Sequence, residues 1–326
     1  MLPTPLQEEI GEDVATEGFN AGEVIIEHVA NSGLDHPLIH FPLAPFGIDF
    51  SVTKHVLMLW IVALVVFVTI TFSIRRYLKQ NRPIPTGFIN ALEAIVVFIR
   101  DNIVEPNVGK KWVNTWTPLL LTLFVFILTA NVIGLIPIFD VLGLLHWILA
   151  HTVLNSVDEG FAAQLFGEEG IVTLLLHGGT TATANFNVTA GLATITFFAI
   201  IAAGTMAHGF VQHWKNLVPS GLAKPIYIIL IPIEFMSLFV RPFALTMRLA
   251  ANMTGGHIAI LAIFSFVFIF TELSENALVG IGIGAFVAVP MAVAISALEI
   301  IVVLVQAYVF TLLSAVFIGM AIHAHH

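Results

Sequence analysis

The sequence predicts an all-α integral membrane protein with several spanning helices, a surface amphipathic helix and two apolar segments too long for an upright span. Hydrophobic residues make up 58% of the 326 residues and charged residues only 10%, whereas soluble domains have about 25% charged residues. Several stretches are uncharged over the ~20 residues that one spanning helix requires. The net charge of −9 and the lack of phosphate-loop or dinucleotide motifs disfavour nucleic-acid and nucleotide binding.

The chain is expected to begin with an acidic tail followed by a first span. Residues 1–54 are polar and acidic, and they lack the basic start and apolar core of a cleaved signal peptide. Residues 56–74 then carry no charge over nineteen positions, which is enough to cross the bilayer. We therefore divide the chain into a tail, 1–54, and a membrane domain, 55–326.

A helix over about 87–105 is predicted to lie on the membrane surface. Its apolar residues recur at helical spacing, with charged and amide residues between them, which is typical of an interfacial amphipathic helix. Packing against a soluble partner is the alternative. The apolar positions are Phe88, Ile89, Leu92, Ile95, Val96, Ile99 and Ile103.

Two further spans are predicted at about 117–139 and 188–211, with an acidic insertion at 140–187 between them. An apolar piece near the start of this insertion is shorter than the ~17 residues of a short span, so we expect this piece to be interfacial or re-entrant. The histidines of the insertion lack the spacing of a metal site, and those at the C-terminus are expected to form a solvated interfacial tail, with metal binding as the alternative. These histidines are His146, His151, His177, His323, His325 and His326.

The basic residues predict the orientation of these spans. Seven of the twelve Lys and Arg residues lie between the first two spans, and Lys215 and Lys224 follow the third. The positive-inside rule therefore places both loops in the cytoplasm or its equivalent. The tail and the insertion then face outward.

The last third of the chain contains two unusually long apolar segments, about 225–270 and 276–322. Each would be roughly 70 Å long as one helix, whereas the hydrocarbon core is only ~30 Å thick. Each must therefore tilt strongly, bend or turn back on itself. Pro232, Pro242 and Gly255-Gly256 are the candidate bends.

A polar stripe runs along the first of these segments. Glu234, Arg241 and Arg248 are spaced seven residues apart and Asn252 follows four residues later, so all four lie near one helix face. Polar groups on an otherwise apolar helix must face something other than lipid. A structural ion pair between Glu234 and Arg241 is the alternative for those two residues.

Arg248 is the strongest candidate for function. A guanidinium does not lose its charge in proteins, and at membrane depth it costs at least ~2.5 kcal/mol. The two segments and their connection contain only four acidic residues. We therefore expect the anion that balances Arg248 to come from another subunit.

Two acid–base candidates accompany this arginine. His257 lies nine residues after Arg248, on roughly the opposite helix face, and Glu299 and Gln306 share a face of the second segment. A histidine titrates near neutral pH, and burial moves a carboxyl group toward the same range. Such a pair is suited to passing protons.

These motifs resemble those of a known family. The runs PIEFMSLFVRPFALTMRLAANMTGGH and ALEIIVVLVQAYVFTLL, together with TANVIGLIP and ANFNVT, are similar to subunit a of rotary F-type ATP synthases. The resemblance covers roughly residues 50–322. It implies two long, strongly inclined membrane helices that lie against a ring of c subunits, each of which has one membrane-embedded carboxyl.

The resemblance also implies roles for individual residues. Arg248 matches the essential arginine, Glu299 and His257 the pair that lines the outward half-channel, and Glu234 the acid of the inward half-channel. Asn252 and Gln306 match polar neighbours of the arginine. Asn185 stands where many relatives have an aspartate, which places any proton-relay role there in doubt.

The family further implies a proton-translocating subunit without a catalytic nucleotide site or cofactor. Its partners would be the c ring, peripheral-stalk b subunits, the rest of the synthase and the lipid bilayer, in a bacterial inner membrane or, alternatively, an organellar energy-converting membrane. A proton is favoured over sodium as the coupling ion. The competing hypotheses are a secondary transporter with a midplane site at broken helices and a scaffold without transport.

Overall fold

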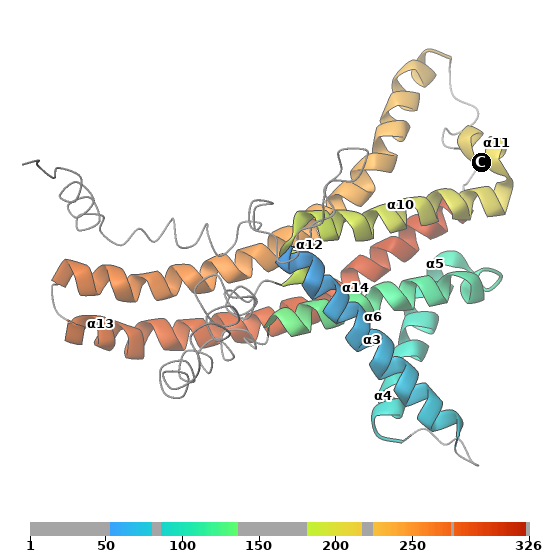
Figure 1. Cartoon of the computed structure of the whole chain (residues 1–326). Helices are drawn as coiled ribbons and strands as arrows, with labels where there is room; N and C mark the ends of the chain where they lie inside the picture. The colour runs from blue at the N-terminus through green and yellow to red at the C-terminus, as the bar shows by residue number, and fades with distance from the viewer. Residues whose placement is uncertain (1–52, 80–85, 136–180, 217–223, 275–276, 324–326) are drawn as a thin grey trace, which may run out of the picture. The chain divides into compact units, whose positions relative to one another are not determined.

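All regular elements in the described part of the chain are helices, which confirms the predicted all-α class. The computed structural model describes residues 53–79, 86–135, 181–216, 224–274 and 277–323 (Figure 1). Five helices in these ranges are long and apolar enough to cross a membrane. The tail through residue 52, most of the insertion with its three histidines, and His325 and His326 lie outside the described residues.

The first three membrane helices cover the predicted spans with shifted ends. Helix α3 is Lys54–Leu78, α6 is Val113–Leu135 and α10 is Phe186–His208. A short 3₁₀ turn, η3 (Ala182–Ala184), precedes α10, and α11 (Phe210–Lys215) follows it. Gly209 separates α10 from α11 with φ 86°, a backbone conformation that glycine adopts without a steric cost.

The first long segment is one continuous helix. Helix α12 runs from Lys224 to Ser274, with Pro232 and Pro242 inside it. The alternative that this segment turns back on itself is therefore wrong. The second segment consists of α13 (Ala277–Ile283), a π-helical stretch η4 (Gly284–Ala288) and α14 (Val289–Ile322).

The contacts divide the chain into two compact units, which are described separately. Among the described residues, the hairpin unit contains 254–274 and 277–299, and the bundle unit contains 53–253 and 300–323 with the gaps given above. The boundaries fall inside α12 and α14, so these two helices contribute to both units.

Glycines allow the two antiparallel helical segments of the hairpin unit to pack closely. The end of α12 and the chain from α13 to residue 299 run antiparallel, side by side (Figure 1). A Cβ at Gly280 would lie 2.9 Å from the Cβ of Thr271, and a Cβ at Gly284 would lie 3.5 Å from Val267. Small residues at such positions let membrane helices approach each other.

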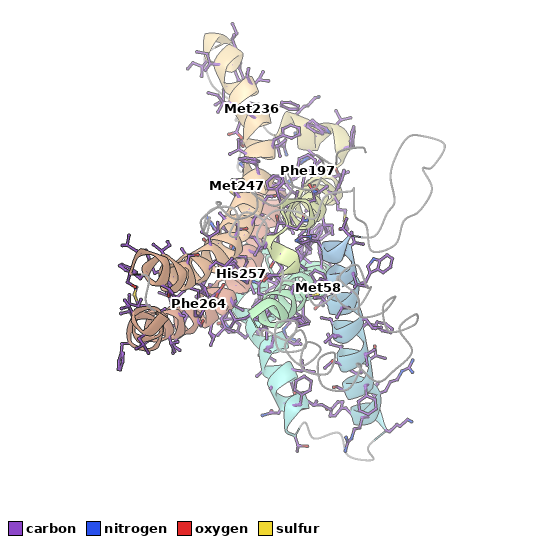
Figure 2. All side chains as sticks on the ribbon, turned by 60° about the vertical axis from the view of Figure 1, so that its left-hand side comes forward. Met58, Phe197, Met236, Met247, His257 and Phe264 are labelled. Carbon is purple, nitrogen blue, oxygen red and sulfur yellow. The ribbon has the colours of Figure 1, made fainter. Side chains whose placement is uncertain are left out.

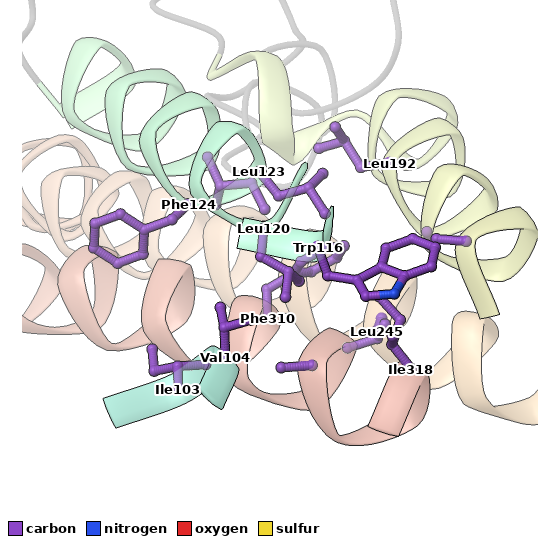
Figure 3. Packing of buried hydrophobic residues seen from close by; sticks show 14 of the residues in the cluster. Ile103, Val104, Trp116, Leu120, Leu123, Phe124, Leu192, Leu245, Phe310 and Ile318 are labelled. Atoms are coloured by element: carbon purple, nitrogen blue, oxygen red, sulfur yellow. The ribbon is translucent and has the colours of Figure 1, made fainter. Parts of the chain in front are cut away.

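The bundle unit is built around an apolar core to which six elements contribute. Trp116, Leu120 and Leu123 of α6 pack near Phe310 of α14 (Figure 3). Further buried members are Ile103 and Val104 of the π-helical stretch η1 (Ile99–Val104), Leu192 of α10, Leu245 of α12 and Ile318 of α14. A hydrogen bond between Thr196 Oγ1 and Ser314 Oγ, 3.2 Å long and buried, also joins α10 to α14. The core therefore fixes the bundle-unit parts of α12 and α14, which carry the polar residues considered below.

The predicted surface helix is divided into two environments. It forms α4 (Phe88–Phe98), a π-helical stretch η1 (Ile99–Val104) and α5 (Glu105–Val108). No residue of α4 is buried, whereas Ile99, Ile103 and Val104 are 0% exposed. The second half thus differs from the sequence-based expectation, because its apolar face is covered by the protein's own bundle.

Apolar side chains cover the outward faces of the long helices, as expected for contact with lipid. On α12, for example, Met236 and Met247 are exposed and project away from the helix (Figure 2). The described chain is therefore a multi-pass membrane protein. Its core and the outward surface of its long helices are both mostly apolar.

The close packing of the hairpin unit yields a testable prediction. Gly280→Ala should lower thermal stability, because its Cβ would press on Thr271 and lie 3.2 Å from the carbonyl oxygen of Val267; overpacking costs ~1–3 kcal/mol. Gly282→Ala, with nothing within 4 Å, should match or exceed the wild type, since alanine favours helix by ~1 kcal/mol. The midpoint of thermal aggregation in detergent measures both. Equal effects of the two variants would contradict the described packing.

Candidate functional site

Arg248 is an exposed residue of the bundle unit that has no anionic partner among the described residues. Its neighbours Leu245 and Leu249 are 1% and 0% exposed, whereas Arg248 is exposed. None of the ion pairs and hydrogen bonds among the described residues includes its guanidinium. Its fixed charge is therefore available to an anion from outside the described residues.

The proposed ion pair between Glu234 and Arg241 is not formed. The guanidinium carbon of Arg241 lies 5.7 Å from the ring centre of Phe317, a cation–π contact. Glu234 Oε2 instead accepts a hydrogen bond of 3.3 Å from Ser237 Oγ, one turn away. The structural pairing considered for these two residues is therefore wrong, and Glu234 is a half-buried carboxyl group without a basic partner in the described chain.

Asn252 connects the two long helices one turn from Arg248. Its Nδ2 donates a hydrogen bond of 2.9 Å to Oε1 of Gln306. Gln306 is 3% exposed, and its Nε2 has no hydrogen-bond partner among the described residues. The bond between Asn252 and Gln306 therefore joins α12 to α14 four residues from the exposed Arg248.

The hairpin unit brings together Glu299 and His257, the acid–base pair named in the sequence analysis. Glu299 is 4% exposed, its Oε1 accepts no hydrogen bond from the described residues, and its carboxyl interacts electrostatically with His257. His257 is half-buried on α12 (Figure 2). A buried acid beside an imidazole can hold one shared proton and release it at little cost.

Gly256 makes room for this carboxyl group. A Cβ built on Gly256 would contact Glu299 Oε1 and lie 2.9 Å from its carboxyl carbon. A Cβ on Gly255, in contrast, would have nothing within 4 Å. The pair Gly255-Gly256 was expected only as a possible bend, and of these two glycines Gly256 has a specific packing role beside the acid.

A buried polar cluster that sequence reasoning missed lies where α6 ends and α10 begins. Thr183 Oγ1 donates a hydrogen bond of 2.5 Å to Oδ1 of Asn131, and both residues are 0% exposed. The Nδ2 of Asn131 has no partner. A Cβ at Gly134 would collide with Thr181, so this glycine lets η3 approach the helix. The signal in the sequence was an amide inside an uncharged span, where an unsatisfied polar group needs water or a partner.

Asn185 has a structural role at the start of α10. Its Oδ1 accepts hydrogen bonds from the backbone nitrogens of Asn187 and Val188 at 2.8 and 3.4 Å. This is the arrangement of a helix N-cap, for which asparagine and aspartate are equally suitable. Among the described residues, no group of three or more His, Asp or Glu side chains is placed to hold a metal ion.

Comparison with known proteins gives consistent matches over nearly the whole chain. The family model described as ATP synthase A chain matches residues 56–319. The chain is 38% identical to ATP synthase subunit a 2 of Chlorobium luteolum, over 95% of this chain and 78% of that protein. It is 35% identical to ATP synthase subunit a of Anaeromyxobacter dehalogenans, over 98% of this chain and 75% of that protein.

The contact between Asn252 and Gln306 can be tested by cross-linking, because the chain contains no cysteine. The double variant Asn252→Cys/Gln306→Cys should form an intrachain cross-link with a short thiol-reactive reagent, since the native side chains meet at 2.9 Å. Asn252→Cys/Val305→Cys is the control, because Val305 is 50% exposed on another face. Gel mobility reports the cross-link, and equal yields in both variants would contradict the contact.

Proposed function

Because the chain belongs to the ATP synthase A chain family, we propose that it is the stationary subunit that carries protons past a rotating ring in the membrane sector of the synthase. The family assignment makes it a multi-pass membrane component of an F-type ATP synthase, concerned with ion transport for ATP synthesis. Its contact with the ring and the proton path through its own residues are the parts proposed here.

The exposed, unpaired guanidinium of Arg248 is the observation that carries this proposal. An arginine at membrane depth without a carboxylate of its own requires an external anion. A ring of c subunits would supply that anion, one carboxylate at a time. Arg248 would stabilise each carboxylate after it releases its proton, because hydrocarbon alone would force the group to stay protonated.

The same positive charge would prevent a proton from crossing without rotation. A proton that approaches Arg248 meets a fixed cation, so direct passage from one side of the subunit to the other is electrostatically unfavourable. The proton must instead remain on a ring carboxyl until rotation carries it round. Each proton that crosses releases ~2.3 kcal/mol per 100 mV of membrane potential, and this energy would drive the ring.

Different residues would serve the two half-channels. Glu299 and His257 would receive protons on the outward side, since the buried acid and the imidazole interact in the hairpin unit. Glu234, half-buried and bonded among the described residues only to Ser237, would accept protons on the cytoplasmic side. Asn252 and Gln306 would hold α12 and α14 together close to Arg248.

The proposed assembly contains the c ring, peripheral-stalk b subunits and the remaining subunits, on which the nucleotide chemistry would take place. The bacterial relatives favour a bacterial inner membrane, and the pairing of His257 with Glu299 favours protons over sodium. A secondary transporter would use broken helices at its binding site. The continuity of α12 from Lys224 to Ser274 therefore favours the stator.

Replacement of Arg248 tests the proposal. Arg248→Ala should reduce ATP-driven proton pumping by at least about 100-fold, because charge compensation at membrane depth is worth ~2.5–3.5 kcal/mol. Arg248→Lys should also fail, since a lysine can lose its proton in an apolar site and lacks the planar fork of donors. Pumping is measured with a pH-sensitive dye in inverted vesicles.

The control for these variants is Met247→Ala, an exposed neighbour of Arg248 that leaves the guanidinium in place and should pump normally. All variants must assemble to the same extent as the wild type, which immunoblotting of the purified complex determines. Normal pumping by an assembled Arg248→Ala complex would exclude the stator mechanism. A scaffold role predicts that outcome.

The space beside Glu299 gives a second test of the proton path. Gly256→Ala should slow pumping by about fivefold or more, because the added methyl displaces the carboxyl group and overpacking costs at least ~1 kcal/mol. Gly255→Ala adds the same methyl to the same helix where nothing lies within 4 Å, so pumping should stay within about twofold of the wild type. Pumping that is equal in both variants would remove Glu299 from the path.

A further inference from the structure

A groove in the bundle unit lies between α3, α4 and α6. Its volume is about 560 Å³, within the range of sites that hold a small apolar ligand. Its lining is apolar apart from a few hydroxyl groups and one carboxyl, that of Glu93. Representative wall residues are Val66 and Ile70 of α3, Leu92 of α4 and Leu121 of α6. No residue of the proposed proton path lines it.

The lining residues follow one face of each helix. On α3 they include Val66, Ile70 and Tyr77, which are four and seven residues apart and therefore lie on one face. These residues are half-buried, whereas Phe67 and Val68 beside them are 68% and 53% exposed. The groove is thus a sheltered surface on a helix that otherwise faces outward.

The groove has the depth of one lipid leaflet. Its wall on α3 extends from Leu78, the last residue of the helix, to Val66 near the middle of the helix. Twelve residues of helix rise about 18 Å, whereas half of the hydrocarbon core is ~15 Å thick. A spanning helix of a partner would need a surface about 30 Å long. The length therefore fits an acyl chain that enters from one side of the membrane.

Basic residues surround the end of the groove that would meet the water. Arg75 and Arg76 occupy the last turn of α3, and Lys79 follows directly. All three are exposed, and none forms an ion pair among the described residues. The groove lining contains one carboxylate, the exposed Glu93. The sum of this negative charge and the three positive charges is positive, which suits an anionic headgroup.

We propose that this groove binds one anionic phospholipid of the cytoplasmic leaflet. Its acyl chain fills the space between α3, α4 and α6, and its phosphate lies near Arg75 and Arg76. Tyr77, an amphipathic side chain at the level of the headgroups, forms part of the wall near the entrance. The lipid thereby joins α4, which has no buried residue of its own, to the two spanning helices.

Native mass spectrometry of the intact membrane complex tests this proposal. The delipidated complex is titrated with dioleoylphosphatidylglycerol or with dioleoylphosphatidylcholine, and the number of retained lipids is counted. We expect Val66→Trp, which fills the deep end of the groove, to lose one phosphatidylglycerol. Val68→Trp is the matched control, because it places the same side chain on an outward-facing position of α3 and should retain the lipid.

A second variant keeps the test independent of folding. Arg75→Gln/Arg76→Gln changes only exposed residues, and the affinity for phosphatidylglycerol should fall about fivefold for each arginine removed, since a basic residue near the surface contributes ~1 kcal/mol. Equal retention of the two lipids, or equal behaviour of Val66→Trp and Val68→Trp, would overturn the proposal. Release of another membrane protein by Val66→Trp would also overturn it, since a partner helix would then occupy the groove.

Discussion

The rest of the structure depends on one electrostatic constraint, a fixed positive charge on an apolar helix that no acid among the described residues neutralises. Arg248 is exposed beside the buried Leu245 and Leu249, and the nearest acid of the stripe, Glu234, is bonded to a serine instead. An ion of this kind is stable in a membrane only with an external anion or with water. We propose that a charged partner binds at the exposed Arg248, whereas Leu245 and Leu249 beside it belong to the core.

Close helix packing supports this constraint. Asn252 and Gln306 join α12 to α14 one turn from the arginine, and in the hairpin unit Gly280 and Gly284 bring the antiparallel helices together. The lack of a side chain at Gly256 has a different effect, because it makes room for the carboxyl of Glu299. Small residues thus determine both how closely the helices pack and where a buried acid can lie.

The sequence was sufficient for the helical class and for the presence of helices that can span a membrane, because long uncharged runs are a signal that a single chain displays directly. The isolated guanidinium of Arg248 is also visible in the sequence, and the role assigned to it stays a prediction. The sequence was insufficient where two distant segments meet. Arg241 makes a cation–π contact with Phe317, and the pair with Glu234, which was considered as an alternative, does not form. The cluster around Asn131 and Thr183 joins residues 52 positions apart, and the burial of Ile99 and Ile103 depends on helices that follow them. Periodicity predicts a face, but it does not identify what covers that face.

The most direct measurement is a structure of the intact membrane complex at a resolution that shows the guanidinium of Arg248. The account predicts that this group faces a carboxyl group of the adjoining ring, at ion-pair distance or through one water (about 3–5 Å), with no carboxylate of its own chain in contact. A guanidinium paired with Glu234, or with any other acid of the same chain, and directed away from the ring would contradict it.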